Sequence, residues 1–315
     1  MVDFISDKDV AANDPFEEYY NSVIVPMVEE DNKLKEKYHS QFWGYFWSIM
    51  FLMGANLLIV LFNALMHDHP ISFQQLFIVN VVAFLIMLVP IYRYRRAQKK
   101  DVFDAFVQYY GGLVHHKDTA VKLVHSPIIP FHETVNATHN VSGNCGEAKI
   151  EIRDTVYQKS GMLGKMSYQR TVSSGVVLFM TFAQNFRGKI LIFDRNGFYR
   201  KKKFADMEYM NNKLDIPAAN YFYIFTDNED FAENMLPALF FERVLDLKEV
   251  FGAKHLYIEI CGNYVRMYFE GAQLYFDNYG FWSRKTDKNK FLQLNKAFEQ
   301  VFMFVSLIEV LKEKQ

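Results

Sequence analysis

Two long stretches without a charged residue lie in the first third of the sequence, and they constrain the fold most. The first, Phe42–Met66, runs for about 25 residues, and the second, Ile71–Tyr92, for about 22. A helix rises about 1.5 Å per residue, so either stretch is long enough to cross the ~30 Å hydrocarbon core of a bilayer. Only His67–Pro70, a short polar segment, separates them. The sequence therefore predicts a transmembrane hairpin of two helices, over residues 42–92.

Positive charges flank this hairpin on one side only. Lys33, Lys35 and Lys37 precede the first stretch, and a second group of cations follows the other, whereas the connecting loop carries no Lys or Arg. That second group is Arg93, Arg95, Arg96, Lys99 and Lys100. Because cytoplasmic loops are enriched in Lys and Arg, both termini are expected in the cytoplasm. The lipid bilayer is then the first expected partner.

Three asparagines interrupt the apolar stretches: Asn56, Asn63 and Asn80. An amide group is costly in hydrocarbon, so each is expected to contact another helix rather than lipid. These contacts predict a homo-oligomer or a membrane-protein partner. An alternative is a small channel or transporter subunit, in which several hairpins assemble a polar path.

The segments on either side of the hairpin have helical patterns. Residues 1–41 are expected to form an N-terminal cytoplasmic segment, with a helix over Phe16–Ser40 that is interrupted at Pro26. Residues 93–147 are expected to form a stalk helix followed by an extended linker.

From residue 148 to 315 the pattern changes to short apolar strands mixed with helices. Two of the expected strands, 254–261 and 264–269, are joined by Gly262–Asn263, a favourable two-residue hairpin turn. The other strands are expected at 148–159, 174–183, 188–195, 220–226 and 273–277, and the helices at 229–251 and 290–313. Hairpins outnumber strand–helix alternations, which favours an α+β domain with a mostly antiparallel sheet and two long helices.

This layout resembles the bacterial family known as domain of unknown function 3137. The residues that carry the resemblance are the apolar hairpin and four segments: FEEYY at 16–20, FRGKILIFDRNGF at 186–198, FTDNEDFAENMLP at 225–237 and IEICGNYVRMYFE at 258–270. The resemblance implies a bacterial inner-membrane protein with a short N-terminal helical segment, a transmembrane hairpin and a cytoplasmic α+β domain. It implies no activity, cofactor or site residue.

Composition and motifs exclude several classes of function. The formal net charge of -1 argues against a nucleic-acid partner, which would require a basic surface. The sequence contains no Gly-x-Ser-x-Gly, His-Glu-x-x-His or Cys-x-x-Cys motif, and we identify no catalytic or cofactor-binding residue. We therefore expect a membrane-anchored binding or assembly module rather than an enzyme.

Two groups of residues are weaker candidates for a site. His125, His132 and His139 lie in a histidine-rich region and have the chemistry of zinc ligands, so a metal-dependent membrane-bound enzyme is an alternative. Their spacing matches no compact zinc motif, and scattered surface or hydrogen-bonded histidines explain the region better. The basic run Arg200, Lys201, Lys202 and Lys203 is a candidate for contact with anionic lipid headgroups, with a solvated loop as the plainer interpretation.

Overall fold

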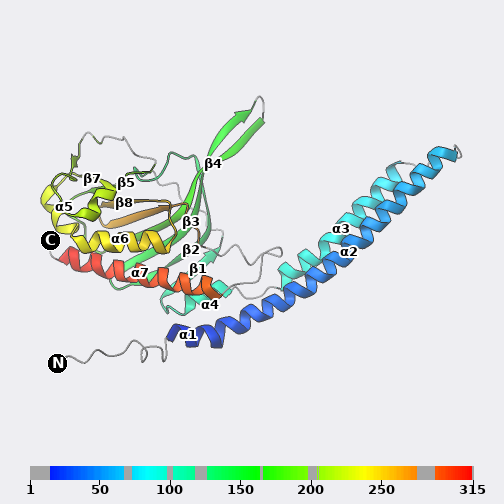
Figure 1. The fold of residues 1–315 in the computed structure, drawn as a ribbon, viewed down its shortest axis with the longest axis horizontal. Helices are drawn as coiled ribbons and strands as arrows, with labels where there is room; N and C mark the ends of the chain where they lie inside the picture. The colour runs from blue at the N-terminus through cyan, green and yellow to red at the C-terminus, as the bar shows by residue number, and fades with distance from the viewer. Residues whose placement is uncertain are drawn as a thin grey trace. The chain divides into compact units, whose positions relative to one another are not determined.

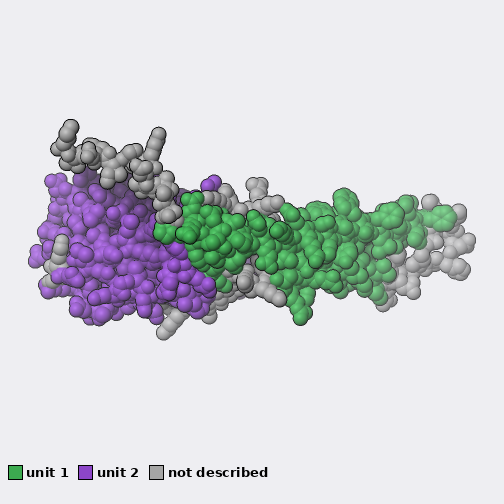
Figure 2. Space-filling model, turned by 90° about the horizontal axis from the view of Figure 1, so that it is seen from below, with its two compact units in different colours: residues 1–105, 276–286 green, residues 106–275, 287–315 purple. Residues whose placement is uncertain are grey.

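A computed structural model describes residues 15–66, 73–97, 102–117, 126–163, 166–197, 204, 206–274 and 288–313. The chain splits into two compact units, which Figure 2 colours separately. The first unit comprises Met1–Ala105 with Phe276–Thr286, and the second comprises Phe106–Tyr275 with Asp287–Gln315.

The first unit contains a pair of long antiparallel helices (Figure 1). Its elements are α1 Pro15–Tyr19, the π-helical turn η1 Tyr20–Ile24, α2 Val25–Met66, α3 Phe73–Ala97 and the first residues of α4 Val102–Gln108. The break expected at Pro26 does not occur, because the helix continues from Pro15 to Met66. The backbone N–H of Val25 donates to the carbonyl of Tyr20, and this wider turn relieves the clash that a proline ring makes with the preceding turn of an α-helix.

The apolar parts of α2 and α3 are long enough and apolar enough to cross a membrane. None of the apolar window of the first helix is buried within the structure, and 17% of the window of the second is. Large side chains such as Phe51, Leu58 and Phe77 are 81%, 70% and 59% exposed. A core helix of a soluble protein would bury such residues, whereas here they lie on the surface of the helix pair.

A small polar and aromatic cluster joins α2 to α3 beyond the apolar stretches. The Tyr94 hydroxyl donates to the Asp31 carboxylate at 3.1 Å, and Lys35 Nζ lies 3.9 Å from the same carboxylate. Tyr94 also packs with Phe42, and the ring of Tyr38 meets it edge-on. All three members of the polar group are buried, so this contact fixes the register of the two helices.

The described residues of the second unit form a nine-stranded antiparallel sheet in the order β1-β2-β3-β4-β9-β8-β5-β7-β6. The strands are β1 Leu113–Lys117, β2 Thr134–Cys145, β3 Ala148–Leu163, β4 Met166–Thr181, β5 Ile190–Asp194, β6 Glu208–Tyr209, β7 Phe222–Thr226, β8 His255–Cys261 and β9 Tyr264–Glu270. The expected β8–β9 hairpin is confirmed, since Cys261 pairs with Tyr264 across a turn in which Gly262 has a φ of 56°. The ends of β3 and β4 extend beyond the other strands as a projecting hairpin (Figure 1).

Helices cover one face of this sheet, which we call the first face. Its helices are η2 Pro217–Tyr221, α5 Glu229–Met235, α6 Ala238–Val250 and α7 Lys288–Glu313, and Figure 1 shows α6 and α7 across the same side of the strands. Leu256, Ile258 and Ile260 of β8 alternate onto the first face, as expected, and are fully buried. Phe251, at the end of α6, packs on Phe269 of β9 with 4.6 Å between the ring centroids.

Two expectations about the second unit require correction. Residues 113–117 and 134–145, expected within an extended linker, are the first two strands of the sheet, so the sheet begins well before residue 148. These strands are rich in Asn, His and Ser, which conceals the alternation. The helix expected over 229–251 is divided into α5 and α6, because Pro237 cannot continue the hydrogen-bonding pattern of α5. The α+β class with a mostly antiparallel sheet is confirmed.

Candidate functional site

The opposite side of the sheet, which we call the second face, carries a different set of side chains. Tyr157, Val177, Tyr257 and Tyr268 point to this face and are buried. Residues 126–133, between β1 and β2, contribute Ile128 and Ile129 to the same cluster. No helix among the described residues is part of this cluster.

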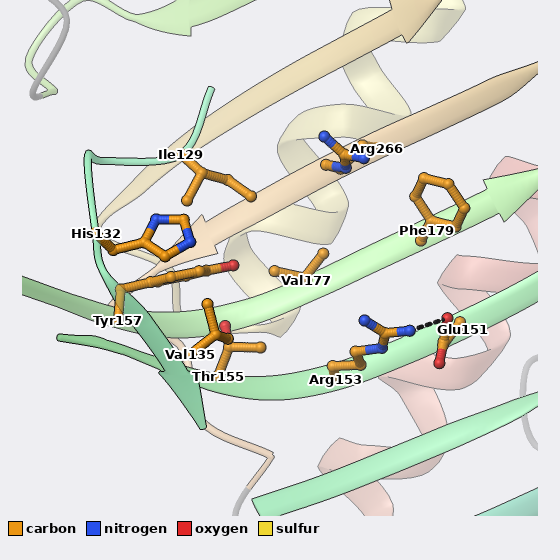
Figure 3. Close-up of a pocket in the computed structure, with 10 residues that line it drawn as sticks. All are labelled: Ile129, His132, Val135, Glu151, Arg153, Thr155, Tyr157, Val177, Phe179 and Arg266. Carbon is orange, nitrogen blue, oxygen red and sulfur yellow. Dashed lines mark ion pairs between the residues drawn. The ribbon is translucent and has the colours of Figure 1, made fainter. Parts of the chain in front are cut away.

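A pocket of about 120 Å³ lies between residues 126–133 and the second face of the sheet (Figure 3). The lining residues come from segment 126–133 and from β2, β3, β4 and β9: Ile129, His132, Val135, Glu151, Arg153, Thr155, Tyr157, Val177, Phe179 and Arg266.

The strand register explains why charged and apolar side chains meet there. On β3, the positions Glu151, Arg153, Thr155 and Tyr157 alternate onto the second face. Across the sheet, Glu151 is paired with Phe179, Phe179 with Arg266, and Arg266 with Glu259. The pairing therefore sets acidic, aromatic and basic side chains in one row over four neighbouring strands.

Arg266 forms the more deeply buried of two ion pairs. Its Nη1 donates to Glu259 Oε2 at 3.1 Å, and the two side chains are only 9% and 4% exposed. The guanidinium also lies over the rings of Phe179 and Tyr264, at 5.2 and 5.1 Å from their centroids. Ser126 Oγ donates to the same Glu259 oxygen at 2.6 Å, so this carboxylate ties segment 126–133 to the sheet.

Arg153 forms the second ion pair, nearer to solvent. Its Nη2 lies 2.5 Å from Glu151 Oε2, and Glu151 Oε1 accepts from Asn140 Nδ2 at 2.8 Å. Arg153 Nε is buried and meets no acceptor among the described residues. An unpaired buried donor is unfavourable, so this nitrogen marks a position where an added acceptor would be stabilising.

Tyr157 contributes a neutral hydroxyl to the pocket. Its ring packs against His132, with 4.7 Å between centroids, and against Tyr268, with 5.5 Å. Burial raises the pKa of Tyr157, while its hydrogen bond with Thr155 and the charges of Arg266 and Arg153 oppose that rise. The hydroxyl is therefore protonated at neutral pH, and Figure 3 shows it pointing toward Val177.

The histidines expected as metal ligands take separate partners. His132 lines the pocket, where its Nδ1 lies 2.8 Å from the carbonyl of Pro130. His139, on β2, stacks with His115 of β1, with 3.0 Å between the nearest ring nitrogens. His125 lies outside the described residues. Within the part of the chain that the structure describes, no group of three or more His, Cys, Asp or Glu side chains is placed to hold a metal ion.

The other sequence candidates are not among the residues that line this pocket. Asn56 Nδ2 and Asn80 Oδ1 are both buried and have no hydrogen-bond partner among the described residues, one being a donor and the other an acceptor. The side chain of Asn63 and the whole basic run of Arg200, Lys201, Lys202 and Lys203 lie outside the described residues.

The pocket was not found from the sequence, although a signal for it is present. Glu151, Glu259 and Arg266 each stand between two apolar residues in the segments IEIRD, YIEIC and VRM, and Arg153 stands between Ile152 and Asp154. A charge at alternate positions of a strand usually indicates a solvated face. Here the strands that carry these charges, β3, β8 and β9, lie inside the sheet. Alternating charges on such strands indicate buried ion pairs on a second covered face.

Comparisons with known proteins agree with part of the sequence analysis. A family model described as "Protein of unknown function (DUF3137)" matches residues 171–313, from β4 to the end of α7, so the resemblance is confirmed over this region. No curated protein matches the chain. Among solved structures, the crystal structure of the mycobacterial trehalose monomycolate transport factor A, TtfA, has a TM-score of 0.41 and 10% identity, covering 66% of this chain and 92% of that one. A likeness at this level says nothing about what this chain binds.

Proposed function

We propose that this chain is a membrane-anchored binding module of the bacterial inner membrane, in which α2 and α3 cross the bilayer and the pocket on the second face receives a ligand. The exposed apolar surface of both helices supports the anchoring. The cations at Lys33, Lys35, Lys37 and after the second helix support an orientation with both termini in the cytoplasm.

One observation carries the binding function: a concave site in which two arginines, a tyrosine hydroxyl and apolar walls converge. Pockets of this composition, mostly apolar with a few oriented polar groups, are typical of ligand sites. The buried Arg266–Glu259 pair gives no clear gain in stability over an apolar pair, so its presence is better explained by a requirement for charge in the pocket. No observation on the described residues favours a metal-dependent enzyme or a channel.

Two experiments test this function. Single cysteines placed in the second unit of the full-length chain should react with a membrane-impermeant reagent only after the cells are opened, and labelling of intact cells would contradict the orientation. For binding, a chemically diverse set of small molecules is screened by thermal shift on detergent-purified protein. At least one compound should stabilise the wild type but not Val177→Trp, which fills the pocket. The same stabilisation in both proteins, or none in either, would refute the binding function.

A further inference from the structure

We infer that the pocket on the second face binds a small organic carboxylate, with its anionic group held between Arg153 and Arg266 and its apolar part against Val177 and Phe179. This inference rests on the proposed binding function and adds the chemical class of the ligand. Figure 3 shows the two guanidinium groups on either side of the strand that carries Val177 and Phe179, with Arg153 directed to Glu151. The register agrees, because β3 and β9, which carry the arginines, are the two neighbours of β4.

Each guanidinium retains donors after its ion pair is made. A guanidinium has five N–H groups, whereas Arg266 contacts Glu259 through Nη1 and Arg153 contacts Glu151 through Nη2. Arg153 Nε is buried without an acceptor among the described residues. A planar carboxylate matches the fork of a guanidinium better than a single acceptor does, and it supplies oxygens on two sides.

The charge balance of the site favours an anion with a single charge. Arg153 and Arg266 are each offset by one carboxylate, and Lys189 Nζ lies 4.0 Å from the other oxygen of Glu259. Neither Glu259 nor Lys189 lines the pocket, and the lining itself carries two cations, Arg153 and Arg266, and one acidic group, Glu151. A monoanion neutralises that excess, whereas a dianion would add an uncompensated charge to a partly buried site.

The walls of the pocket favour a ligand with an apolar body. Ile129, Val135, Val177 and Phe179 offer no hydrogen bonds, so they cannot satisfy the several oxygens of an inorganic phosphate or sulfate. The volume of about 120 Å³ limits the enclosed part to the size of a short-chain or aromatic carboxylate. The protonated Tyr157 hydroxyl provides a further donor that does not add to the positive charge.

The test uses the full-length protein in detergent and titration calorimetry with benzoate and butyrate as probes. Benzamide serves as the neutral analogue of benzoate, and inorganic phosphate as an anion without an apolar part. Both carboxylates should bind, with benzamide and phosphate at least about tenfold weaker, because a hydrogen bond to a charged group contributes about 1.5–3 kcal/mol and 1.4 kcal/mol corresponds to a factor of ten.

Arg153→Met should weaken benzoate binding by about tenfold or more, and Arg153→Lys, which keeps the charge but loses the planar fork, should weaken it less. The matched control is Arg243→Met, since Arg243 on α6 pairs with Asp246 outside the pocket and should leave the affinity unchanged. Equal affinities for benzoate and benzamide, tighter binding of phosphate, or an unchanged affinity in Arg153→Met would overturn the assignment. Failure of the binding function gives a different result: no compound in the thermal-shift screen would stabilise the wild type more than Val177→Trp.

Discussion

The Arg266–Glu259 pair supports a quantitative prediction for Arg266→Met. The substitution leaves a carboxylate that is only 4% exposed without its guanidinium partner. Removing one member of a buried ion pair typically costs about 3–5 kcal/mol, because the remaining charge is poorly solvated. The cation–π contacts of the guanidinium with Phe179 and Tyr264 add to the loss, and each contact contributes at least the ~0.5–1 kcal/mol that is typical of exposed sites. A domain with an unfolding free energy of about 5–15 kcal/mol would therefore become marginal.

Amide hydrogen exchange on the full-length protein in detergent measures this loss where it occurs. Peptides from β8 and β9 should exchange about 10³- to 10⁵-fold faster in Arg266→Met than in the wild type, since each 1.4 kcal/mol changes the opening equilibrium tenfold. Arg243→Met is again the matched control. Its pair with Asp246 has side chains that are 34% and 48% exposed, so less than about 1 kcal/mol is expected there.

A second variant separates the loss of charge balance from the loss of packing. Adding Glu259→Gln to Arg266→Met removes the stranded charge while keeping an acceptor for Ser126, and it should recover at least half of the lost stability. Two results would contradict the prediction: a loss of less than about 1 kcal/mol in Arg266→Met, or a double variant as unstable as the single one. Either would mean that water solvates the Glu259 carboxylate well without its arginine.

Three further outcomes can be measured. Gly175→Val should lower the unfolding free energy by about 1–3 kcal/mol in urea denaturation followed by circular dichroism, because a Cβ at Gly175 would lie 2.2 Å from the carbonyl oxygen of Phe269; a neutral effect would contradict this close approach. Burial raises the pKa of Tyr157 above that of a tyrosine in the unfolded chain. The stability that comes from this difference is fully present below about pH 10, where the unfolded chain also holds the proton, and is lost as the pH rises through the folded pKa. Tyr157→Phe should therefore flatten this alkaline fall in the unfolding free energy, and an unchanged slope would count against the prediction. If Asn56 and Asn80 hold copies of the chain together, their substitution by Ala should shift the assembly state seen by light scattering in mild detergent, and an unaltered mass would refute that contact.

The parts of the fold that sequence patterns predicted are those with a strong local cause. The uncharged lengths of 42–66 and 71–92 identified α2 and α3, and Gly262–Asn263 identified the β8–β9 turn. The patterns failed where a wider context decides the outcome. A π-helical turn carries the helix past Pro26, and strands β1 and β2 are stabilised by pairing with β3 rather than by their own polar residues.

The pocket depends on contacts that sequence patterns do not contain. Arg153 and Arg266 lie more than one hundred positions apart in the sequence. Both line the pocket because their strands, β3 and β9, are the two neighbours of β4 in the sheet. Ile129 and His132 reach the same space from an irregular segment whose anchor is the hydrogen bond between Ser126 and Glu259. The family match does not help, because it begins at residue 171 and excludes β3 and its Arg153.

The outer part of the β3–β4 hairpin has a different relation to the rest of its domain. Residues 159–163 pair only with 166–170 among the described strands, and no third strand supports them. Gly161 faces Tyr168, and the tyrosine ring lies across the glycine backbone, where an added Cβ would be 2.6 Å from Cζ. Beyond the hairpin, Ser160 N–H donates to Glu133 and Lys159 Nζ lies over the Phe131 ring, so with these few contacts we expect this finger to open at a lower free energy than the sheet. A change in the length of this finger should therefore leave the rest of the sheet folded.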